Sequence, residues 1–148
     1  MSLKLWLEKG WLKEHKPTSR EIAELLAVAD RALRDCQIPE LSSEGKLNMA
    51  HNAALQSSTA ALAAAGYKSS REAYHYYVIE SLSFTLRMDG SIIRSLHKLR
   101  RKRNISDYER PQTITEQEAR DMIRLAKLVC QQVEEWIRNN YKELAEEI

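Results

Sequence analysis

The sequence is poor in the residues and patterns that many functional classes require. Its four glycines form neither a GxGxxG nor a GxxxxGK loop, which are the usual cradles for nucleotide phosphates. Its two cysteines, Cys36 and Cys130, have no CxxC spacing and lie within apolar helical patterns, so we expect both to be reduced core residues. No GxSxG or Cys/His nucleophile motif is present. The sequence therefore gives no support to the common nucleotide-binding, zinc-binding or hydrolase classes.

Metal-binding and membrane-spanning patterns are also missing. The four histidines are dispersed and the acidic residues form no Asp-x-Asp loop, so we expect no metal and no cofactor. The longest uninterrupted apolar stretch is residues 60–65, whereas a membrane helix needs about 20 apolar residues. The first residues lack the apolar centre of a signal peptide. We therefore expect a cytoplasmic protein with no membrane partner.

The composition is that of a single globular domain. The chain has 148 residues, of which 43% are hydrophobic, and this length and apolar content suit one core. We therefore expect one domain over residues 1–148, with its bundle core at about residues 18–145. The 23 basic and 21 acidic residues give a formal net charge of +2. Because the overall charge is so small, any basic binding site must be local.

Helical spacing of apolar residues recurs along the chain, and no segment shows the alternation of a half-buried strand. Three segments begin with the Ser/Thr-x-x-Glu spacing of a capping box, at Thr18, Ser69 and Thr115. The sequence predicts an all-α fold, an antiparallel bundle of four main helices with short additional helices. The main helices are expected at about residues 18–38, 42–65, 69–88 and 115–145, and the additional ones at 3–15 and from about 91.

The chain concentrates positive charge at residues 94–103, where six basic residues occur with no acidic one. Helical spacing places Arg94, Lys98 and Arg101 along one side, with Leu96 and Leu99 anchoring the other. Such a surface is suited to binding phosphates.

A simpler interpretation of the same stretch is that the charged side is merely solvated. In that case Arg103 pairs with Asp107 at the i, i+4 spacing, and the helix has no ligand. His75 lies on the preceding helix, one turn beyond Arg71, and it joins the basic segment only if the two helices are adjacent.

Several motifs in this order resemble the HEPN family, small helical-bundle proteins that include RNA-cleaving toxins and partners of minimal nucleotidyltransferases. The resemblance spans roughly residues 18–137. It rests on Ala-Asp-Arg-Ala-Leu-Arg-Asp ending at Asp35, Asn-Met-Ala-His-Asn-Ala-Ala ending at Ala54, His75, and Leu-Arg-Arg-Lys-Arg-Asn-Ile-Ser-Asp-Tyr-Glu ending at Glu109. It implies a homodimer in which the basic motifs of two subunits meet across a cleft.

In nuclease members of that family an arginine, commonly followed by a polar residue, precedes a histidine by a few positions. Arg103 and Asn104 match the start of this motif, but Tyr108 stands where the histidine is expected. A tyrosine with its ordinary pKa of about 10 is a poor general base near neutral pH, although it can donate a hydrogen bond to phosphate. The candidate catalytic residues are Arg103 and Tyr108, and the candidate ligand-binding residues are Arg100, Arg103, Asn104, Asp107 and His75.

These observations favour a HEPN-like dimer that binds RNA or another phosphate-bearing ligand through the Arg-Asn-x-x-Asp-Tyr segment and does not catalyse a reaction. Two alternatives remain open. In the first, the protein is a metal-independent ribonuclease toxin of a toxin-antitoxin pair, with Tyr108 or His75 replacing the missing histidine. In the second, it is a non-catalytic interaction module for a nucleotidyltransferase partner.

Overall fold

The computed structural model spans residues 1–148; it describes the backbone except at residues 71–73 and 109–113, and the side chains except at 71–74 and 103–113. The fold is all-α, as predicted, with one small two-stranded sheet. The elements in chain order are α1 (Leu3–Glu8), β1 (Leu12–Glu14), α2 (Ser19–Asp35), α3 (Ser43–Ala64), β2 (Tyr67–Ser69), α4 (Tyr74–Glu80), α5 (Leu82–Thr85), α6 (Gly90–Tyr108) and α7 (Glu116–Asn140).

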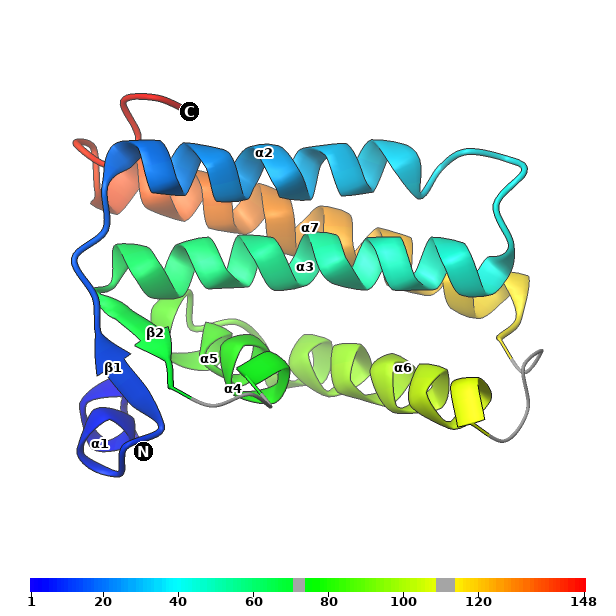
Figure 1. Ribbon diagram of the computed structural model, residues 1–148, viewed down its shortest axis with the longest axis horizontal. Coiled ribbons are helices and arrows are strands. Elements are labelled where there is room, and N and C mark those ends of the chain that lie inside the picture. Colours follow the sequence, from blue (N-terminus) through cyan, green and yellow to red (C-terminus); the bar gives the residue numbers. More distant parts are fainter. Residues whose placement is uncertain (71–73, 109–113) are drawn as a thin grey trace.

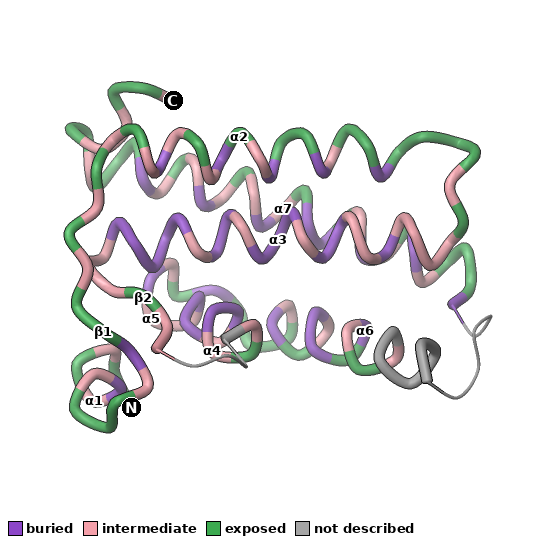
Figure 2. The backbone as a smooth tube through the Cα atoms, in the orientation of Figure 1, coloured by how far each residue is buried: buried purple, intermediate pink, exposed green. Residues whose placement is uncertain are grey.

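Helix α3 is the centre of the fold. It contacts α2 and α7 on one side and α4, α5 and α6 on the other, and Figure 1 shows α2 and α3 running in opposite directions. Figure 2 shows α3 buried over most of its length, whereas α2 and α7 bury one side each. A helix packed on all sides needs apolar residues around its whole circumference, and the alanines of α3 supply them with little bulk. The sequence of α3 thus lets two groups of helices pack close together.

The ends of the long helices are fixed by the residues that the sequence indicated. The Thr18 hydroxyl accepts a hydrogen bond from the Glu21 backbone N–H at 3.1 Å, and Ser42 caps α3 through the Gly45 N–H at 3.0 Å. Thr115 and Glu118 form the complete reciprocal capping box. The predicted starts of α2, α3 and α7 are therefore confirmed.

The helix expected over residues 69–88 is only partly confirmed. Ser69 belongs to β2, and the helical part that the structure describes is divided at Ser81 into α4 and α5. The buried Ser81 hydroxyl donates to the Val78 carbonyl at 2.6 Å, and the Thr85 hydroxyl donates to the Ser81 carbonyl at 3.2 Å. Hydroxyls that bond carbonyls of the preceding turn often bend helices, and two such bonds flank the division here.

The sheet was not expected from the sequence. Strand β1 pairs antiparallel with β2, with Leu12 opposite Ser69. Trp6 of α1, only 4% exposed, packs edge-on against Tyr77 at 5.5 Å and Phe84 at 5.1 Å. The N-terminal segment therefore closes one end of the helical core.

The two remaining helices also differ in length from the expectation. Helix α6 extends over Gly90–Tyr108 and is one of the long helices rather than a short addition. Helix α7 ends at Asn140 instead of near residue 145, because Tyr141 leaves helical geometry with φ −136° and packs its ring against Trp136. Cys36 and Cys130 are both free thiols, and no helix among the described residues is long and apolar enough to span a membrane.

Candidate functional site

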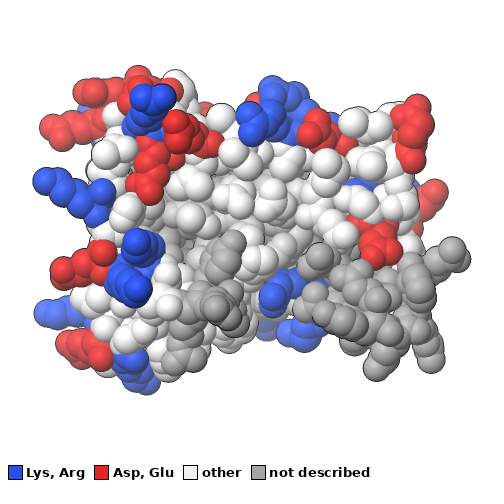
Figure 3. Space-filling view, in the orientation of Figure 1, with Lys and Arg blue, Asp and Glu red and all other residues white. Residues whose placement is uncertain are grey.

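Helix α6 separates its basic and apolar side chains as the sequence predicted. Arg94, Lys98 and Arg101 are exposed, while Leu96 and Leu99 are buried. Figure 3 shows basic side chains over the described part of α6. The buried leucines hold α6 on the core, and this leaves the three cations facing solvent.

The cations of α6 differ in how their charge is compensated. Lys102 forms a salt bridge of 2.6 Å with Glu118 and so ties α6 to α7. Arg94 lies near enough to Asp89 to contribute, after the hydrogen bonds from Ser91, to lowering the pKa of the Asp89 carboxyl. Lys98 and Arg101 form no salt bridge with any residue that the structure describes. These two cations are neighbours at the i, i+3 spacing and lie exposed on the same side of α6. We call them the Lys98/Arg101 pair.

Arg100 does not belong to this exposed surface. Its side chain is half-buried and its Nε atom is buried, so it lies on a different side of α6 from the Lys98/Arg101 pair. Arg103, Asn104, Asp107 and Tyr108 are part of the α6 backbone, but their side chains lie outside the described residues. Their predicted roles, including a pairing of Arg103 with Asp107, therefore stay predictions.

His75 is half-buried near the start of α4, and its ring lies near that of a second histidine. The His75 ring lies 6.2 Å from the ring of His51, centroid to centroid, and His51 is buried on α3. Helix α4 contacts both α3 and α6, so the adjacency of the His75 helix to the basic helix is confirmed. The sequence did not single out this pair, because the two residues belong to helices whose contact is tertiary.

A further polar cluster joins α4 to α6. His97 of α6, 8% exposed, donates from Nε2 to the Glu80 carboxylate at 2.8 Å, and the Tyr76 ring stacks on His97 at 4.8 Å. The Glu80 charge, with a smaller effect of burial, raises the pKa of the Tyr76 hydroxyl. The cluster thus fixes the position of α6 beside α4. In the sequence this cluster was indicated only by His97, a single histidine within the basic residues 94–103.

Comparison with known families, curated proteins and solved structures found no match for this chain. No group of three His, Cys, Asp or Glu side chains suited to a metal ion occurs in the described part of the chain. The described residues offer two exposed cations on one helix, neither in a salt bridge with a described residue, and two histidines close together on neighbouring helices.

Proposed function

We propose that this protein binds RNA or another phosphate-bearing ligand through the exposed side of α6. The observation that carries the proposal is the Lys98/Arg101 pair, two exposed cations with no salt bridge to a described residue. Solvent-exposed lysine and arginine on one helix side make favourable contacts with consecutive phosphates, because each contact releases condensed counterions. The resemblance to HEPN proteins favours RNA among phosphate-bearing ligands and adds Arg103, Asn104 and Tyr108 to the same segment.

We further propose that the functional unit is a homodimer, as the resemblance implies. A dimer that brings two α6 helices together doubles the local positive charge while each chain keeps a net charge of only +2. Light scattering on the eluted protein should then give twice the 17.1 kDa mass of one chain. A mass of one chain at all concentrations would contradict the dimer.

Binding to a short single-stranded RNA tests the main proposal. The variant K98A/R101A should bind that RNA roughly tenfold or more weakly, because it loses two phosphate contacts. Fluorescence anisotropy of labelled RNA measures the change.

A matched control separates contact from overall charge. Arg20 and Arg138 are surface cations on α2 and α7, so R20A/R138A removes the same formal charge away from α6. This control should bind RNA nearly as well as the wild type. An equal loss of RNA affinity in both variants would mean that binding depends only on net charge, and it would contradict a binding site on α6.

A ribonuclease is the second candidate, favoured by the closeness of His51 and His75. Two histidines at this separation suit a general acid and base in metal-independent cleavage, with Arg103 stabilising the charged phosphorane. The purified protein would then cleave RNA in the presence of a metal chelator, and both R103A and H75A would abolish cleavage. RNA binding without RNA cleavage would instead support a protein that binds RNA and does not cut it.

A further inference from the structure

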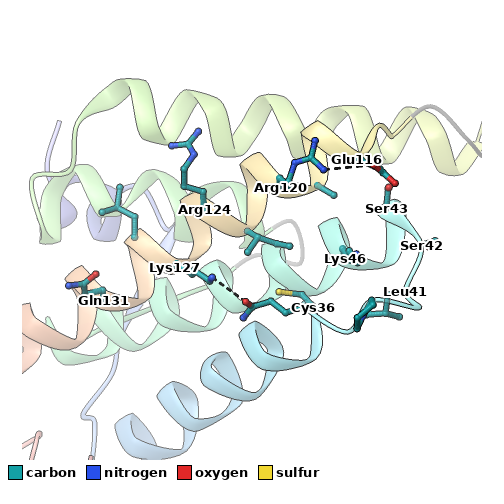
Figure 4. Close-up of a pocket in the computed structure, with 15 residues that line it drawn as sticks. Cys36, Leu41, Ser42, Ser43, Lys46, Glu116, Arg120, Arg124, Lys127 and Gln131 are labelled. Atoms are coloured by element: carbon teal, nitrogen blue, oxygen red, sulfur yellow. Dashed lines mark hydrogen bonds and ion pairs between the residues drawn. The ribbon is translucent and has the colours of Figure 1, made fainter.

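A pocket of about 1070 Å³ opens between the loop after α2, the first turn of α3 and one side of α7 (Figure 4). Ligand sites for small organic molecules commonly measure about 300–1000 Å³, so the pocket has room for one such molecule. The residues that line it all lie outside α6. It is therefore distinct from the surface proposed for RNA.

The floor of the pocket is apolar. Cys36 and Ala119 are buried at its base, and Leu41, Ile123 and Leu128 are half-buried around them. Covering these side chains removes apolar surface from water, which favours a ligand with an apolar body.

The rim of the pocket is strongly basic. It carries four cations, Lys46, Arg120, Arg124 and Lys127, and a single carboxylate, that of Glu116. The formal charge of the lining is thus +3, larger than the +2 of the whole chain. Ser42 caps the start of α3 at the same edge, and the N-terminal end of a helix carries partial positive charge.

Of the four rim cations, Lys46 and Lys127 have their positive charge least balanced by carboxylates. Arg120 and Arg124 reach Glu116 and Asp121, each at 3.8 Å. Lys127 donates to the neutral amide of Gln37 at 3.2 Å, and half-buried Lys46 forms no salt bridge with any described residue.

Cys36 is flanked in the view of Figure 4 by Lys46 on α3 and Lys127 on α7. Burial raises the pKa of the Cys36 thiol, and the charges of Lys127 and Lys46 act against that effect. Both ammonium groups are therefore close enough to act on one point at the base of the pocket. An anion at this point would face positive charge from two helices.

We propose that this pocket binds a small organic phosphate. Its phosphate lies between Lys46 and Lys127, whose ammonium groups can both donate charge-assisted hydrogen bonds to it, and its apolar body covers Leu41 and Ile123. The proposal does not depend on RNA binding by α6, and either can fail while the other stands.

Phenyl phosphate is the probe, because it joins a phosphate to a flat apolar body of suitable size. In an NMR titration it should shift backbone signals of residues 37–46 and 119–128, and it should bind more tightly than inorganic phosphate or the neutral benzyl alcohol. The variant K46M/K127M keeps the aliphatic stems and should bind phenyl phosphate about tenfold or more weakly. K98A/R101A on α6 should bind it as the wild type does.

Two results would overturn the proposal. One is the absence of saturable shifts at the pocket, and the other is unchanged affinity in K46M/K127M that retains the wild-type unfolding midpoint. If K46M/K127M unfolds, the single variant K127M replaces it, since Lys127 is exposed and its loss costs little stability.

Discussion

At the scale of single residues, two histidine–glutamate pairs differ in how far they are buried. His97 and Glu80 form one such pair, with side chains 10% and 35% exposed and 2.8 Å between Nε2 and Oε2. His15 and Glu21 form a second pair of equal length, with 24% and 37% exposure. The two pairs share their chemistry and differ mainly in the burial of the histidine.

Replacing His97 with alanine should lower the free energy of unfolding by about 2 kcal/mol, because Glu80 loses its donor and Tyr76 loses its stacking partner. Urea denaturation followed by circular dichroism measures the change. His15→Ala removes the more exposed histidine and should lower the free energy of unfolding by a smaller amount. Equal losses in the two variants would mean that burial of the histidine does not set how much each pair stabilises the fold.

Cys130 should be unusually unreactive. Burial raises the pKa of its thiol to about 11 even though the Ser57 hydroxyl, 3.0 Å from the sulfur, favours the thiolate. Relative to an ordinary thiol of pKa 9.0, the thiolate fraction near neutral pH falls roughly a hundredfold. Iodoacetamide labelling at about pH 8 with mass spectrometry should therefore modify Cys130 slowly in the native protein and readily in urea. Rapid native labelling of Cys130 would refute this account.

At the scale of elements, Glu118 connects two helices at once. Its carboxylate accepts from the Thr115 backbone N–H at 2.9 Å within the capping box of α7 and binds Lys102 of α6 at 2.6 Å. Burial alone would raise the pKa of the Glu118 carboxyl, but the hydrogen bonds from Lys102 and Thr115 outweigh it and lower the pKa. The charged form of Glu118 is thus favoured by folding.

The substitution E118Q keeps a residue that can complete the capping box and removes the charge facing Lys102. It should lower the free energy of unfolding by about 1 kcal/mol at neutral pH, the upper range for a partly exposed ion pair. Because the folded-state pKa lies below the ordinary 4.5, this stabilisation is complete above 4.5 and is lost as pH falls through the folded pKa. Denaturation of both proteins across acidic pH should show their difference shrinking, and a constant difference would contradict the assignment.

The sequence predicted well those elements that are determined by residues a few positions apart in the chain. Thr18 and Thr115 cap α2 and α7 through residues three positions away, and the exposed side of α6 follows from its spacing. The break at Ser81 was missed because the apolar spacing continues through it, and the hydroxyl bonds of Ser81 and Thr85 are seen only in the folded chain. The pairing of β1 with β2 was missed because strands of three residues are too short to show alternation.

At the scale of the whole molecule, charge is placed unevenly although the net charge is only +2. The Lys98/Arg101 pair lies on α6, and the basic pocket lies by α7 at the loop that joins α2 to α3. The first surface was predicted from one run of the sequence. The second was not, because its cations come from α3 and α7 and meet only in the folded chain.

Direct contact between α6 and phosphates predicts how RNA binding depends on salt concentration. Each phosphate contact with a single strand contributes about 0.7 to the slope of log K against log salt concentration. The slope for K98A/R101A should therefore be smaller than that of the wild type by about 1.4, and the slope for R20A/R138A should be unchanged. Equal slopes for wild type and K98A/R101A would show that these two cations do not touch the RNA.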